Sequence, residues 1–166
     1  MRKLVESLLP LAVGVAVFGA AIWYLVSRGM GLGLWLLAAL LIGHGLIHAM
    51  FAMPRPGKPP AEGALKWPFD MADSWLVTRA GLGLRPVRTI GFALAGVVVA
   101  GFVYAGLASV GVMVPVTAWR SGVIVSAAAS VALLALFFNP QLVIGLGIDA
   151  ALLWIVVGVA WAPVGA

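Results

Sequence analysis

The chain has 166 residues and no cysteine. Without thiols it cannot form disulfides, thiolate metal sites or a redox dithiol, which excludes thiol oxidoreductases and zinc-thiolate folds. Charged residues are also scarce, at 9% of the chain against 64% hydrophobic residues. So little polar material cannot cover the surface of a soluble globule. We therefore expect an all-α polytopic membrane protein.

Several functional signatures are missing as well. The sequence has no phosphate-binding glycine loop followed by lysine, no H-E-x-x-H and no serine elbow. We therefore predict no catalytic residue, and a role other than enzyme is favoured. The net charge of +5 does not indicate a nucleic-acid partner, because the basic residues flank apolar segments instead of gathering on a soluble domain.

Five apolar segments are each long enough to cross a bilayer. They predict a single transmembrane domain over 1–166, a five-helix bundle with helices over about 7–26, 29–53, 87–112, 117–138 and 141–161. The first segment resembles a secretory signal, but its apolar residues continue to Val26, which favours an uncleaved helix.

The distribution of lysine and arginine predicts the orientation. With a cytoplasmic N-terminus, Arg28 and Arg120 lie outside and the other eight of the ten basic residues lie inside. Those eight are Arg2, Lys3, Arg55, Lys58, Lys66, Arg79, Arg85 and Arg88. This positive-inside bias places the long loop 54–86 in the cytoplasm and the C-terminus outside.

The loop 54–86 begins with prolines and continues with an amphipathic stretch. Asp70 or Asp73 can cap a short helix over about 71–81. We expect this helix in the headgroup region, and the alternative is an ordinary loop that folds over the helix ends. Membrane lipids are the expected partners there, and the lipid-interface candidates are Trp67, Trp75, Arg79, Arg85 and Arg88.

Glycines recur in the third segment, at Gly91, Gly96, Gly101 and Gly106. At this density glycine lets the backbones of membrane helices approach closely. The alternative is that these glycines only reflect the composition of the chain.

Polar residues interrupt the apolar segments at His44, His48 and Asp149. The two histidines are four residues apart and share one helix face. One interpretation is structural, with the histidines as hydrogen-bonded groups between helices. The other is functional, with the histidines as ligand contacts, proton-relay groups, or ligands of a haem or a divalent metal. A carboxylate near the bilayer centre costs ~2.5 to 3.5 kcal/mol, so we expect Asp149 to face a polar interior.

His44 and Asp149 also lie at the same predicted depth. Each is nine residues from the cytoplasmic end of its segment, at 53 and 140. At ~1.5 Å per residue both are ~13 Å deep. If the two helices adjoin, we expect a hydrogen bond between the imidazole and the carboxylate.

Three short motifs of the chain carry a resemblance. They are HGLIH at 44–48, WPFD with SW at 67–75, and FNP followed by GID at 137–149. In them the chain resembles a family of small uncharacterised bacterial integral membrane proteins. The resemblance implies a multi-pass protein of the bacterial cytoplasmic (inner) membrane and brings no activity with it.

These observations leave three hypotheses open. The first is a helix-packing homo-oligomer or an accessory subunit of a larger membrane complex, with no cofactor implied. The second is a ligand-, metal- or haem-binding or proton-coupled protein that uses His44, His48 and Asp149. The third is an enzyme acting on a lipid or quinone with the same groups as acid and base.

Overall fold

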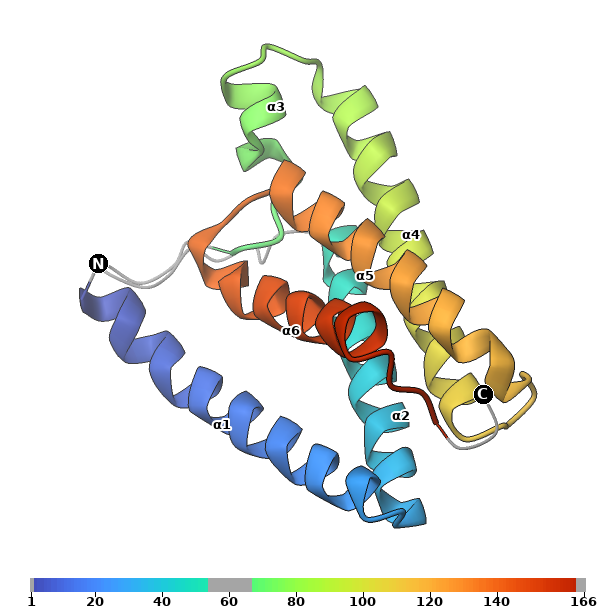
Figure 1. Ribbon diagram of the computed structural model, residues 1–166. Helices are drawn as coiled ribbons and strands as arrows, with labels where there is room; N and C mark the ends of the chain where they lie inside the picture. Colours follow the sequence, from blue (N-terminus) through green and yellow to red (C-terminus); the bar gives the residue numbers. More distant parts are fainter. Residues whose placement is uncertain (1, 54–66, 164–166) are drawn as a thin grey trace.

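The computed structural model describes residues 2–53 and 67–163. Five of its helices are long and apolar enough to cross a membrane. The helices and their short extensions, drawn in Figure 1, are α1 (Arg2–Ser27), α2 (Gly31–Ile47) with η1 (His48–Ala52), α4 (Leu84–Ser109), η3 (Val116–Ala118) with α5 (Trp119–Leu136), and η4 (Pro140–Leu142) with α6 (Val143–Leu153) and η5 (Trp154–Gly158). These five helices identify the chain as a multi-pass membrane protein.

The predicted number of spanning helices is confirmed, and each predicted end differs from the observed one by one to five residues. The first helix begins at Arg2, five residues before the predicted start at Ser7. The last helix ends at Gly158 instead of Trp161, because Ala160 has a positive φ of 53° that a right-handed helix does not allow.

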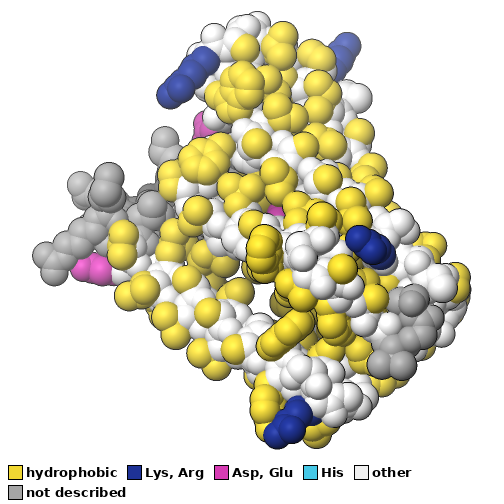
Figure 2. Space-filling view, viewed as in Figure 1, with side chains coloured by type: hydrophobic (Ala, Val, Ile, Leu, Met, Phe, Trp, Pro, Cys, Tyr) yellow, Lys and Arg dark blue, Asp and Glu magenta, His cyan; other side chains and the backbone are white. Residues whose placement is uncertain are grey.

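The bundle centres on α4, which packs along both α2 and α5 (Figure 1). α6 packs against α5, and α1 packs mainly against α2. Only 6% of the residues in the most apolar stretch of the α1 span are buried inside the protein, against 44% in that of the α5 span. Hydrophobic side chains cover most of the visible surface, and charged side chains are few and scattered (Figure 2). Such a surface suits hydrocarbon as its solvent.

Two glycines on α4 explain how closely its neighbours approach. A Cβ added at Gly106 would lie 3.0 Å from the carbonyl oxygen of Ala38 and 2.7 Å from Ile42 Cγ1, both on α2. A Cβ added at Gly101 would collide with Ser126 on α5. The expected role of glycine in close packing therefore holds at these positions, and it fails at Gly96, where the added Cβ would meet nothing within 4 Å.

The predicted helix over 71–81 is wrong as one continuous element. The structure forms two short pieces, η2 (Met71–Asp73) and α3 (Trp75–Thr78), separated at Ser74. Asp70 does cap the first piece, as expected, by accepting a hydrogen bond from the Ala72 N–H at 3.0 Å. The break arises because the Ser74 hydroxyl bonds the Leu136 carbonyl of α5 at 2.7 Å and also accepts from the Leu76 N–H.

This segment, 67–78, folds over the ends of the long helices. Phe69, Met71 and Leu76 are buried in the same hydrophobic core as the helices, and the indole N–H of Trp75 donates to the Ala135 carbonyl at 3.0 Å. These contacts agree with the loop alternative, and an interfacial position of the segment stays a prediction. The predicted proline-rich part of the loop, 54–66, lies outside the described residues.

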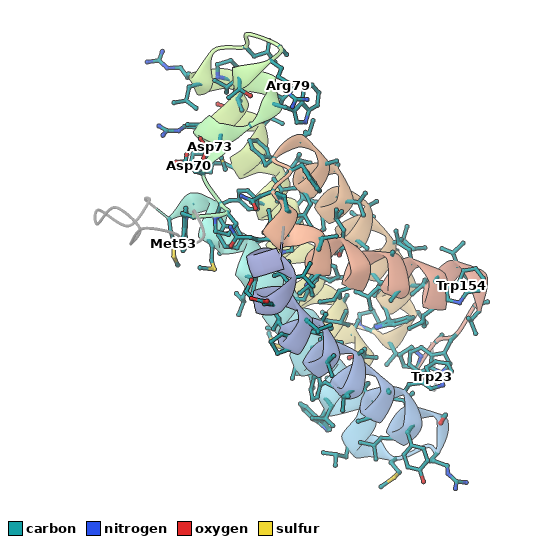
Figure 3. The ribbon with its side chains drawn as sticks, turned by 90° about the vertical axis from the view of Figure 1, so that its left-hand side faces the viewer. Trp23, Met53, Asp70, Asp73, Arg79 and Trp154 are labelled. Carbon is teal, nitrogen blue, oxygen red and sulfur yellow. The ribbon has the colours of Figure 1, made fainter. Side chains whose placement is uncertain are left out.

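Figure 3 shows where the segment 67–78 lies in the bundle. Asp70, Asp73 and Arg79 are at one end, and Trp23 and Trp154 lie toward the other.

Candidate functional site

His44 and Asp149 meet between α2 and α6. The His44 Nε2 and the Asp149 Oδ1 are 2.9 Å apart. Asp149 is fully buried and His44 is 5% exposed. The predicted contact between the two is confirmed, and it offsets part of the cost of burying both polar groups.

His48 joins the same site at the point where α2 changes to a tighter helix. Its backbone N–H reaches the carbonyls of Gly45 and Leu46. Its ring Nδ1 lies 2.9 Å from the His44 carbonyl oxygen. Because a carbonyl oxygen only accepts hydrogen bonds, Nδ1 must carry a proton, and Nε2 is the acceptor nitrogen when the ring is neutral.

Ser130 on α5 connects the two halves of the site. Its Oγ lies 2.5 Å from Asp149 Oδ2 and 2.9 Å from His48 Nε2. One sequence signal points to it, since Ser126 and Ser130 are four apart and share a helix face. The pattern did not lead us to predict Ser130 as a site residue. Ser126, one helical turn away, donates to the Gly122 carbonyl of its own helix at 2.6 Å.

These four side chains, His44, Asp149, Ser130 and His48, form what we call the buried network. Ser130 and Asp149 are fully buried, and His48 is 3% exposed. On the α4 side the Phe102 ring lies edge-to-face against His44, with 5.0 Å between centroids. The network therefore sits in an apolar surrounding, where each hydrogen bond is strong and each missing one is costly.

Counting protons in the buried network shows what it can do chemically. The Ser130 hydroxyl has one hydrogen but two neighbours, Asp149 and His48, that can accept it. When the four side chains together carry no net charge, two arrangements satisfy all four hydrogen bonds. In one, Asp149 and His48 are both neutral. In the other, Asp149 is a carboxylate and His48 is an imidazolium. If one proton is removed, the carboxylate and the neutral His48 ring compete for a single hydrogen. The network can thus hold one proton in two places.

The metal-ligand interpretation of His44 and His48 gains no support. Within 2–53 and 67–163 there is no group of three or more His, Cys, Asp or Glu side chains that could hold a metal ion. The two rings stand edge-to-face with centroids 5.1 Å apart, and the Nε2 atom of each already has a hydrogen-bond partner. We therefore propose neither a metal nor a haem here.

The predicted lipid-interface residues lie apart from the network, around the segment 67–78 and the start of α4. Trp67 is half-buried against Phe69, with ring centroids 5.3 Å apart, and is the least suited to contact lipid. Trp75 is 42% exposed, and Arg79, Arg85 and Arg88 are exposed. Contact of these side chains with headgroups remains a prediction.

A scan of the chain against protein-family models finds no match, and searches of curated proteins and of solved structures find no similar protein. The resemblance to small bacterial membrane proteins therefore stays a prediction.

Proposed function

We propose that this chain is a proton-binding membrane protein of the bacterial cytoplasmic membrane, and that the buried network takes up and releases one proton as it works. One observation supports the proposal above all others: the Ser130 oxygen, which carries a single hydrogen, lies 2.5 Å from Asp149 Oδ2 and 2.9 Å from His48 Nε2. A network that only held helices together would not need this surplus of acceptors. No residue is assigned a catalytic role.

The proposal includes the orientation predicted from the basic residues, with the N-terminus and the segment 67–78 in the cytoplasm and the C-terminus outside. In this orientation the α6 span begins at the cytoplasmic face at Pro140, and Asp149 is the middle residue between Pro140 and Gly158. His48 is four residues, about one helical turn, from the cytoplasmic end of its span at Ala52. Protons would then reach the network from the cytoplasmic side.

Infrared spectroscopy of the protein in lipid tests the proposal. We expect a carboxylic-acid C=O stretching band that disappears as the pH rises and that is absent from the Asp149→Asn variant. The chain has five acidic residues, which keeps the assignment simple. Asp73→Asn is the matched control, because Asp73 is exposed and outside the spanning helices, and it should leave the band unchanged. A wild-type spectrum without any band that depends on Asp149 would refute proton binding at Asp149.

A second candidate function, a helix-packing oligomer or accessory subunit, is supported by α1. This helix leaves an apolar groove of about 560 Å³ between itself and α6, visible as a hollow in Figure 2. Small residues of both helices line it, among them Ala12, Ala16, Gly19, Gly147 and Ala151. Helices in membranes associate through such small residues.

Cysteine cross-linking tests this second candidate, since the chain has no native cysteine. A Gly19→Cys variant places a thiol on the face of α1 that lines the groove, where an added Cβ meets nothing within 4 Å, and Gly43→Cys places one on α2 with equal space. If this face of α1 is the contact between copies, oxidation in native membranes gives dimers from Gly19→Cys and not from Gly43→Cys. A cross-link to a different protein indicates an accessory subunit, and no cross-link from Gly19→Cys would contradict both forms.

A further inference from the structure

The two proton arrangements of the buried network differ only in the bonds around one hydroxyl group. We propose that Ser130 is the relay through which a proton passes between His48 and Asp149. This inference rests on the proposed function and deepens it, because it assigns a route and a group that passes the proton along it.

The step is a shift of two hydrogens across one oxygen. His48 Nε2 releases its proton to Ser130 Oγ, while the Ser130 hydroxyl releases its own hydrogen to Asp149 Oδ2. One N–H and one O–H bond break, and two O–H bonds form. The imidazolium becomes neutral, the carboxylate becomes a carboxylic acid, and the serine ends as the same hydroxyl, so no further reactant is needed.

The geometry of Ser130 suits this step. Its oxygen lies 2.9 Å from the donor nitrogen and 2.5 Å from the acceptor oxygen, and both distances are within hydrogen-bond reach. The other connection between the two groups runs from His48 Nδ1 to the His44 carbonyl. A backbone carbonyl has no hydrogen to pass on, so that path cannot carry the proton.

Within residues 2–53 and 67–163, each helix around the site contributes an identified group. α2 and η1 contribute His44 and His48, and α6 contributes Asp149. α5 contributes Ser130. From α4 the ring against His44 is Phe102. In the part of the chain that the structure describes, the relay thus depends on one residue.

A kinetic experiment tests the relay. The pH around the protein in lipid is lowered rapidly, and the rate at which the Asp149 carboxylic-acid band appears is followed by infrared spectroscopy. Because a positioned proton-transfer group contributes on the order of 100-fold to a rate, Ser130→Ala should slow the appearance of the band by about that factor. The band should still reach full amplitude at low pH, since Asp149 itself is unchanged.

Three further variants make the result specific. Ser126→Ala is the matched control, since Ser126 is equally buried on the same helix and bonds only its own backbone, and its rate should equal that of the wild type. Ser130→Thr keeps the hydroxyl and should restore a fast rate. His48→Gln removes the group that delivers the proton and should be slow. A melting curve for each variant shows that it is folded.

The outcomes separate the two proposals. A Ser130→Ala protein with the wild-type rate would overturn the relay while leaving proton binding at Asp149 intact. A wild type with no Asp149 band at any pH would overturn proton binding at Asp149, whatever the rates.

Discussion

Replacing Asp149 by leucine should lower the melting temperature by about 3 °C or more, because it leaves the His44 N–H without an acceptor and removes one of the two hydrogen-bond partners of Ser130 in an apolar surrounding. A buried group left unpaired costs ~1 to 3 kcal/mol in soluble proteins, and a hydrogen bond between membrane helices contributes ~0.6 kcal/mol on average. A loss of 1 kcal/mol lowers the melting temperature of a chain of this size by ~2 to 4 °C.

Asparagine at the same position is the matched control for this prediction. Its carbonyl oxygen can accept from His44, and its amide can donate to Ser130, which then donates to His48. All four hydrogen bonds are made without a movable proton, so the melting temperature of Asp149→Asn should stay within about 2 °C of the wild type. If leucine were as well tolerated as asparagine, the network would contribute nothing to stability.

Replacing Gly106 by leucine should be as disruptive, through packing instead of polarity. The Ala38 carbonyl oxygen would be 3.0 Å from the first atom of the new side chain, so α2 and α4 must separate. Overpacking of this kind costs ~1 to 3 kcal/mol, which corresponds to a fall in melting temperature of about 3 to 10 °C. Separation of α2 would also displace His44 from Asp149.

Gly96→Leu on the same helix is its control. A Cβ at this position meets nothing within 4 Å, so the new side chain points into open space, and leucine has the better helix propensity. Thermal unfolding of the two variants, with infrared spectroscopy of the Asp149 carboxyl, makes the comparison. Equal stability of Gly106→Leu and Gly96→Leu would show that α2 and α4 are not packed as described.

The sequence predicts that His44 and Asp149 lie at the same depth, for a simple physical reason. Membrane-spanning helices have a known rise per residue, so distance along the chain converts to depth, and both groups are expensive to leave in hydrocarbon. Equal depth does not show that the two helices are neighbours, since five helices can be arranged in several orders. Only the structure shows that the His44 side chain on α2 reaches Asp149 on α6.

Ser130 was missed because serine gives a weak signal. A serine in a membrane helix can bond its own backbone, as Ser126 does, and so costs little wherever it points. The glycines show the same limit, because spacing alone does not distinguish Gly106, which contacts α2, from Gly96, which contacts nothing. The break at Ser74 depends on a carbonyl of α5 sixty-two residues away, which no local pattern reveals.

The most direct test of the central claim, that the buried network holds an exchangeable proton, is the infrared pH titration of the wild type beside Asp149→Asn. We predict a carboxylic-acid band in the wild type that shifts in D₂O, is lost as the pH rises and is missing from the variant, although both proteins melt at similar temperatures. Identical spectra for the two proteins across the whole pH range in which they stay folded would contradict the claim and leave the network a structural contact between helices.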